Sequence, residues 1–144
     1  MDEHFLQLAI DNSKKSAAEG NFPAGAVVVK DGEVLASDTS SPYPGLFHAD
    51  SKAISKAFQE HGVLHGATLY VGLEPCLMCM SVAYWSGIRR IVYAIPKSKV
   101  SSEYYETAHN TNEIINKFNE PITLVHVEVL ESEALQVIRT WEKK

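Results

Sequence analysis

The sequence predicts an α/β protein, a three-layer α/β/α sandwich built on a five-stranded mixed sheet with helices on both faces. Five short apolar runs rich in β-branched residues are typical of strands. Segments with apolar residues at helical spacing separate most of these runs, which is the order expected when helices connect parallel strands. The chain has 144 residues, 45% hydrophobic and 22% charged, so we expect a single globular domain over residues 1–144.

The first element is a helix that begins near Asp2 and ends before Gly20. Phe5, Leu8 and Ala9 recur at helical spacing, and glycine is a common helix stop. The acidic residue at the start favours a helix N-terminus, because the positive end of the helix dipole attracts negative charge. The sequence therefore predicts one amphipathic helix ahead of the first strand.

A hairpin follows this helix. The apolar runs Ala26–Lys30 and Glu33–Ala36 flank the dipeptide Asp31-Gly32, which strongly favours a tight turn between antiparallel strands. Residues 37–47 are rich in serine and proline, and we expect them to form a loop. Only this hairpin requires an antiparallel pair.

The remainder of the chain alternates helices and strands. We expect strands at Ala67–Gly72, Ile91–Ile95 and Ile122–Leu130, and helices at 48–62, 75–87, 112–118 and 131–144. Helices that start directly after strands place their N-termini at one edge of the sheet, where ligands bind in open α/β folds. The segments that begin at residues 48 and 75 are therefore the first places to look for a site.

Charge and composition exclude several classes of function. The net charge is −5, and no basic stripe is present, so we do not expect a nucleic-acid partner. No run approaches the roughly 18 apolar residues of a membrane span, and the acidic N-terminus does not resemble a secretory signal. We expect a cytoplasmic protein without a membrane partner.

Both cysteines of the chain lie in one C-x-x-C, Cys76-Leu77-Met78-Cys79. Zinc accepts thiolate sulfur and imidazole nitrogen, so these cysteines and His48 can fill three of its usual four positions. A fourth position open to water is typical of catalytic zinc. The alternative is a redox or structural C-x-x-C beside a core histidine.

Asp50 follows His48 by two residues, which points its carboxylate toward the same site. A carboxylate there can move protons between water, a ring nitrogen and a departing amine. The alternative role is structural, because an acidic residue in the first turn of a helix gains roughly 0.3–1 kcal/mol from the dipole. The chemistry favours the proton shuttle.

Together, His48-Ala49-Asp50 and Pro75-Cys76-x-x-Cys79 resemble the H-x-E…P-C-x-x-C signature of the zinc-dependent cytidine/cytosine deaminase superfamily, with HAD in place of HAE. The layout is similar to that of the small-base (guanine and cytosine) deaminases and the tRNA adenosine deaminases, over roughly residues 3–95. The resemblance implies a cytidine deaminase-like fold, Zn²⁺ bound by His48, Cys76 and Cys79, and catalysis by Asp50. It also implies a homodimer, with which the apolar Met80, Val82 and Tyr84 are compatible.

The resemblance further suggests substrate contacts. The backbone N–H groups of Ala49 and Cys76 are expected beside the metal-bound water, and Ser37 stands where relatives have a base-binding Asn. We also consider Phe47 as a stacking residue, Tyr104 or Tyr105 in the same role, and Glu103 or Glu106 as acceptors for an amino or ring N–H; the alternative for the last four is a solvated polar loop.

The function predicted from these residues is hydrolytic deamination of an amino-substituted nucleobase or related small heterocycle, of the guanine, cytosine, pterin or triazine type. Ammonia is released after attack of zinc-bound hydroxide. One alternative is adenosine deamination in tRNA. Another is a zinc-bound pseudoenzyme that binds a base without turnover, because Asp50 is one methylene shorter than the usual Glu.

Overall fold

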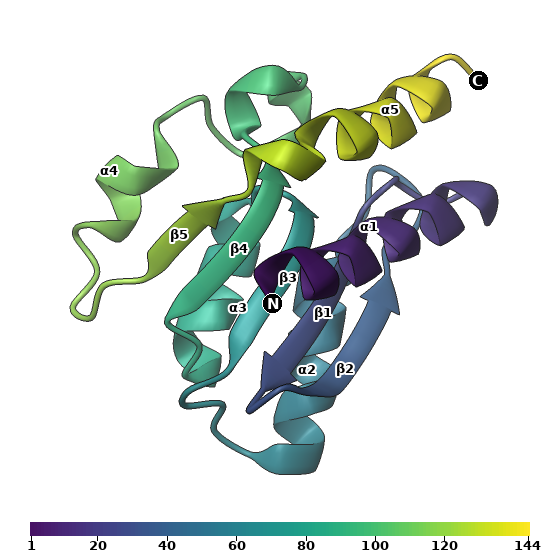
Figure 1. Ribbon diagram of the computed structural model, residues 1–144. Coiled ribbons are helices and arrows are strands. Elements are labelled where there is room, and N and C mark those ends of the chain that lie inside the picture. Colours follow the sequence, from purple (N-terminus) through teal and green to yellow (C-terminus); the bar gives the residue numbers. More distant parts are fainter.

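The computed structural model describes all residues, 1–144, and is a three-layer α/β/α sandwich, as the sequence predicts. Helices α1 and α5 cover one face of the sheet, and α2 and α3 cover the other (Figure 1). The elements are α1 Asp2–Ala18, β1 Gly25–Lys30, β2 Glu33–Thr39, α2 Ala49–His61, β3 Thr68–Leu73, α3 Leu77–Ser86, β4 Arg90–Ile95, α4 Thr111–Ile115, β5 Thr123–His126 and α5 Glu131–Glu142. None of these helices has the length and apolarity needed to cross a bilayer.

The five strands lie in the order β2-β1-β3-β4-β5. β3, β4 and β5 run parallel to one another, whereas β1 is antiparallel to both of its neighbours. The sequence requires an antiparallel pair only in the hairpin, so the β1–β3 pair is a second one. It arises because β3 adds beside β1 and not beside β2, and the connection through α2 therefore crosses over β1.

Two strand boundaries differ from the predicted ones by more than one residue. β2 continues to Thr39, so Ser37 belongs to the strand and not to the loop that follows. β5 ends at His126 instead of Leu130, because Glu128–Leu130 form a 3-10 turn that leads into α5. The short α4 begins one residue before the predicted helix 112–118 and ends three residues before its predicted end.

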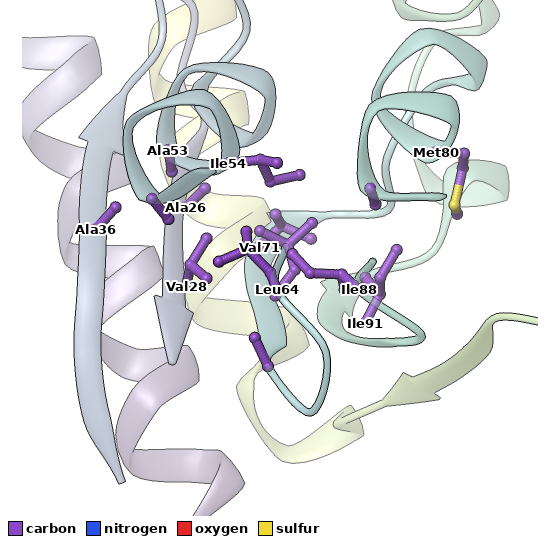
Figure 2. Close-up of a cluster of buried hydrophobic side chains, with 14 of the residues drawn as sticks. Ala26, Val28, Ala36, Ala53, Ile54, Leu64, Val71, Met80, Ile88 and Ile91 are labelled. Atoms are coloured by element: carbon purple, nitrogen blue, oxygen red, sulfur yellow. The ribbon is translucent and has the colours of Figure 1, made fainter. Parts of the chain in front are cut away.

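Side chains of alternating strand residues pack into two separate cores, one on each face of the sheet. In β1, Ala26 and Val28 pack with α2 and α3, whereas Val27 and Val29 pack against α1. Figure 2 shows the first core, where Ile54 of α2 points toward Val71 of β3. Because both faces are covered, the central strands are almost fully buried and the sheet is a rigid base for the loops at its edges.

Helix α1 packs unusually close to the start of β1. A Cβ atom at Gly25 would lie 2.3 Å from the backbone oxygen of Ala9, so only glycine permits this approach. At the start of the helix, the Asp2 carboxylate accepts hydrogen bonds from Arg90 of β4 and Tyr70 of β3. These contacts hold α1 against the sheet at its start and near its middle.

Candidate active site

The starts of α2 and α3 bring together three side chains that could hold a metal ion. His48 is the N-cap of α2 and Cys76 the N-cap of α3, with Cys79 in the first turn of α3. The Nδ1 atom of His48 lies 3.5 Å from each of the two Sγ atoms. All three donor atoms lie within 4.8 Å of one another, close enough to share one ion.

A backbone carbonyl orients the imidazole. The Nε2 atom of His48 lies 2.9 Å from the oxygen of Gly45, and a carbonyl can only accept, so Nε2 carries the proton. Nδ1 faces the two sulfurs: it offers a lone pair to a metal ion when the ring is neutral, and it donates to the Cys76 sulfur when the ring is protonated. Such a second hydrogen bond is the usual device that fixes a metal-binding histidine.

The three groups also shift one another's pKa. Hydrogen bonds from Cys79 and then from His48 lower the pKa of Cys76 to about 6. The hydrogen bond that Cys79 donates to Cys76, together with burial, raises the pKa of Cys79. The hydrogen bond to Cys76 raises the pKa of His48 to about 9. The cluster therefore concentrates negative charge on sulfur, which favours a soft cation.

This donor set fits zinc. Two thiols and one imidazole are ligands that Zn²⁺ prefers, and three protein donors leave one position of a tetrahedron for water. Both cysteines are buried and neither forms a disulfide, so the thiols remain in the form that binds metal.

Asp50 lies at the second position of α2, beside the cluster. Its side chain is buried, with the residue only 8% exposed, and Oδ1 accepts a hydrogen bond from the Ser51 backbone at 3.2 Å. Burial raises the pKa of this carboxyl group. Asp50 and Ala49 both line the cavity described next, so the carboxylate faces the space in front of the cluster.

Two residues of the cluster, His48 and Cys76, line a cavity of about 350 Å³, whereas Cys79 is fully buried and does not line it. The other walls of the cavity come from the loop before α2, the end of β3 and residues 103–106. Four carboxylate side chains line it, those of Asp50, Glu74, Glu103 and Glu106, and none of the 23 lining residues is a lysine or arginine. The cavity is thus acidic and offers acceptors to a ligand rich in N–H groups, chiefly at Asp50 and Glu103, because Glu106 and Glu74 already accept backbone N–H groups.

The residues proposed from sequence as substrate contacts divide into two groups. Ala49, Glu103, Tyr104 and Glu106 line the cavity. Ser37 does not, because it lies on β2, where its hydroxyl accepts a hydrogen bond from the Asn12 side chain at 2.7 Å.

Phe47 also lies outside the cavity, and it is 64% exposed. The neighbouring Leu46 lines the cavity in its place. The loop between Ser41 and Phe47 is closed by a hydrogen bond from the Ser41 hydroxyl to the Phe47 carbonyl. The positions of Ser37 and Phe47 therefore do not support a contact with a ligand in the cavity.

Several lining residues were not singled out from the sequence. Ser40 follows the end of β2, and no sequence pattern marks it. Glu74 comes directly before Pro75-Cys76, and this position is the one signal in the sequence that could have identified it. An aromatic cluster of Phe22, Tyr43, Tyr104 and Trp141 joins four distant segments, with ring centroids 5.0–6.4 Å apart. The first three of these rings line the cavity.

Residues 1–95 match the family model for the cytidine and deoxycytidylate deaminase zinc-binding region. The chain belongs to this deaminase family. It is 27% identical to a probable cytosine deaminase of Schizosaccharomyces pombe, over 86% of this chain and 82% of that protein. It is 32% identical to a tRNA-specific adenosine deaminase of Buchnera aphidicola, over 99% of this chain and 89% of the relative.

The solved structure of guanine deaminase from Bacillus subtilis superimposes with a TM-score of 0.65 at 26% identity, covering 99% of this chain and 94% of that one. Family and structural similarity thus agree with the geometry of the site. The protein is a hydrolytic deaminase with Zn²⁺ as its cofactor. The alternative of a binding protein without activity has no support from these relatives.

Proposed function

We propose that this deaminase acts on a small, unphosphorylated, amino-substituted nucleobase or related heterocycle, and that His48, Cys76 and Cys79 are its zinc ligands. The observation that supports this most directly is the cavity itself. His48 and Cys76 line a space of about 350 Å³ whose lining also holds four acidic residues and no lysine or arginine, and the Cys79 donor atom lies within 4.8 Å of the donor atoms of both.

The reaction needs a nucleophile and a group that moves protons. Zinc, when bound, supplies Lewis acidity that makes water nucleophilic near neutral pH. Asp50 accepts a proton as the water oxygen bonds to the amino-bearing carbon, and it passes that proton to the adjacent ring nitrogen. The remaining hydroxyl proton then travels through Asp50 to the amino group, which leaves as ammonia as the carbonyl forms.

The charge of the cavity selects the class of substrate. Carboxylates accept hydrogen bonds from amino and ring N–H groups, of which aminoheterocycles have several. The same carboxylates repel a phosphate, and no Lys or Arg in the lining compensates for that repulsion. The rings of Phe22, Tyr43 and Tyr104 add aromatic surface for a flat base.

Adenosine in tRNA is the second candidate, and the Buchnera relative favours it. That relative is named for this activity, and the alignment covers nearly the whole chain. The net charge of −5 and the acidic cavity argue against it, because binding of nucleic acid depends on neutralising phosphates with Lys and Arg. The similarity to cytosine and guanine deaminases supports a free base.

The test is ammonia release by the purified zinc-loaded protein. Guanine, cytosine, pterins and aminotriazines are compared with a tRNA anticodon stem-loop. Guanine or cytosine, if active, is also compared with its 5′-monophosphate nucleotide. We expect turnover of one or more free heterocycles and at least tenfold lower kcat/KM for the phosphorylated form. Turnover of the stem-loop alone, or a preference for the nucleotide, would contradict the proposal.

We also propose that the protein is a homodimer, with α3 in the interface. Trp85 on this helix is 80% exposed, and α3 carries no charged residue. Of the apolar residues considered from sequence, Met80 is fully buried within the chain, whereas Val82 and Tyr84 are partly exposed. A cytoplasmic location stays a prediction from the sequence.

A further inference from the structure

Two consecutive residues, Tyr105 and Glu106, form hydrogen bonds with the backbone of the segment that carries the cysteines. The Glu106 carboxylate accepts hydrogen bonds from the backbone N–H groups of Leu77, at 3.1 Å, and Met78, at 3.0 Å. These amides directly follow Cys76 and open helix α3. Glu106 therefore binds the segment on the C-terminal side of Cys76.

Tyr105 binds the same segment on the other side. Its hydroxyl donates a 2.6 Å hydrogen bond to the carbonyl of Glu74, two residues before Cys76. Glu74 is itself fixed, because its N–H donates to Ile95 and its carboxylate accepts from the Lys97 backbone. Cys76 is thus bracketed by hydrogen bonds to adjacent side chains of one short stretch.

The metal site explains why this outside support is needed. The first amides of a helix have no partner inside the helix, and the N-cap side chain usually accepts one of them. Cys76 is the N-cap of α3 but makes no such bond, since its sulfur faces His48. The carboxylate of Glu106 satisfies these amides instead, and its negative charge suits the positive end of the helix.

We propose that Glu106 and Tyr105 are positioning residues of the metal centre, which hold residues 74–78 so that Cys76 and Cys79 keep their zinc-binding arrangement. Both residues also line the cavity. The wall that meets the substrate and the segment that holds the metal are therefore one connected unit. This inference rests on the proposed zinc ligands, and it is independent of which heterocycle is the substrate.

Glu106→Ala tests the proposal through zinc affinity, measured by competition with a chromophoric chelator. Loss of a group that supports a metal ligand typically weakens metal binding by about 10–100-fold, and we expect a loss in that range. Glu106→Gln keeps one acceptor oxygen and should lose less, which is the rescue expected of a hydrogen-bonding role. Tyr105→Phe removes only the hydroxyl, and we expect a loss smaller than that of Glu106→Ala.

Glu103→Gln and Tyr43→Phe are matched controls for zinc affinity. Both residues line the cavity, and the Tyr43 hydroxyl donates to the Glu103 carbonyl, while neither residue forms a hydrogen bond with residues 74–79. We expect both controls to bind zinc as tightly as the unaltered protein. Co²⁺-loaded protein adds a spectroscopic readout, because the thiolate-to-cobalt absorption should change in Glu106→Ala and stay constant in the controls.

Several results would overturn the proposal. Unchanged zinc affinity and an unchanged cobalt spectrum in both Glu106→Ala and Glu106→Gln would show that the contact is only structural, and so would equal losses in Glu103→Gln. Cys79→Ala distinguishes a failure of the zinc-ligand assignment from a failure of the positioning role. If Cys79→Ala keeps full zinc affinity, the ligand assignment fails; if it loses zinc while both Glu106 variants keep it, only the positioning role fails.

Discussion

Cys76, a proposed zinc ligand, shows how metal binding would change the local demands on a helix. Ser, Thr, Asp and Asn are preferred at an N-cap because a side-chain oxygen accepts a first-turn N–H, and replacing such a cap typically costs about 1 kcal/mol. The thiol of Cys76 faces the imidazole instead. Using this residue as a ligand therefore leaves the helix start without a local cap, and Glu106 provides one from 28 and 29 residues away.

Asp50 gives the first prediction at the scale of single residues. Asp50→Asn keeps the size of the side chain and an oxygen that can accept the Ser51 amide, but it removes the proton acceptor. We expect kcat to fall by about 10²–10⁴-fold, the usual contribution of general acid–base catalysis, with zinc content unchanged. Steady-state kinetics together with elemental analysis measure both quantities.

Ser51→Ala is the control for Asp50→Asn, because it alters the same helix start without touching the carboxylate. The Ser51 hydroxyl accepts a hydrogen bond from the backbone N–H of His48, so loss of this hydroxyl directly affects the start of α2. We expect Ser51→Ala to retain most of the activity. An Asp50→Asn variant with unaltered kcat would mean that Asp50 only stabilises the helix.

At the scale of elements, the sequence predicts what depends on neighbours along the chain. Helical spacing of Phe5, Leu8 and Ala9 locates α1, and Asp31-Gly32 locates the hairpin turn, where Asp31 has a φ of 51° and Gly32 a φ of 77°. The pairing of β1 with β3 is not a local property, because it depends on where the chain returns after α2. For that reason the sequence indicates the strands but not the second antiparallel pair.

The same distinction applies to the site. The spacing of His48, Cys76 and Cys79 is visible in the sequence, and the structure brings their donor atoms together. The cavity walls depend on contacts such as the 3.2 Å hydrogen bond from Tyr43 to Glu103, sixty residues later in the chain. Counting residues back from His48 selects Ser37, but β2 extends far enough to place Ser40 at the cavity.

Helix α1 provides a prediction about pH and stability. The Asp2 carboxylate accepts hydrogen bonds from Arg90 Nη1 at 3.0 Å and Nη2 at 2.6 Å, and from the Tyr70 hydroxyl at 2.7 Å. Chiefly because of Arg90, the pKa of Asp2 falls from 3.8 to about 2. A carboxylate with a lowered pKa stabilises the fold above its unfolded-state pKa, and it loses that contribution as pH falls through the folded-state value.

We therefore expect Asp2→Asn to lower the free energy of unfolding by a constant amount above about pH 5, and by progressively less as pH approaches about 2. The side chains of Asp2 and Arg90 are 32% and 40% exposed, so solvent screens the ion pair. The constant difference in the free energy of unfolding should therefore be below about 1 kcal/mol. Urea unfolding of both proteins across this range measures it. Glu3→Gln in the same turn is the control, and a pH-independent deficit in Asp2→Asn would assign the contact to packing and not to charge.

At the scale of the whole molecule, the cavity lies at one edge of the sheet and shares residues with both cores. Each face of the sheet has its own buried cluster, and the cavity lies at the end of β3, where Leu73 and Glu74 line it. This is the edge where ligands bind in open α/β sheets. Ala49 and Val71 belong to one core and also line the cavity, so changes at these two positions would affect packing, whereas Glu103 belongs to neither core.

The surface around α3 exposes several large apolar side chains. Helix α3 is apolar on all sides, a composition that is typical of helices buried on every face. Within a single chain, however, Trp85 projects into solvent beside Tyr84 and the neighbouring Phe118, and Val63 close to Gly87 is 55% exposed. A second copy of the chain would cover this surface through a two-fold interface, in which the same residues meet on both sides.

The last prediction tests this dimer. Buried tryptophans are often the residues that contribute most to an interface, so Trp85→Lys should convert the dimer to a monomer. Light scattering or sedimentation would then give one chain mass of 15.9 kDa where the unaltered zinc-loaded protein gives twice that value. Val129→Lys is the control, because Val129 is 68% exposed in the turn before α5 and its change should leave the dimer intact. A monomeric unaltered protein at micromolar concentration, or a Trp85→Lys variant that remains dimeric, would show that α3 does not form the interface.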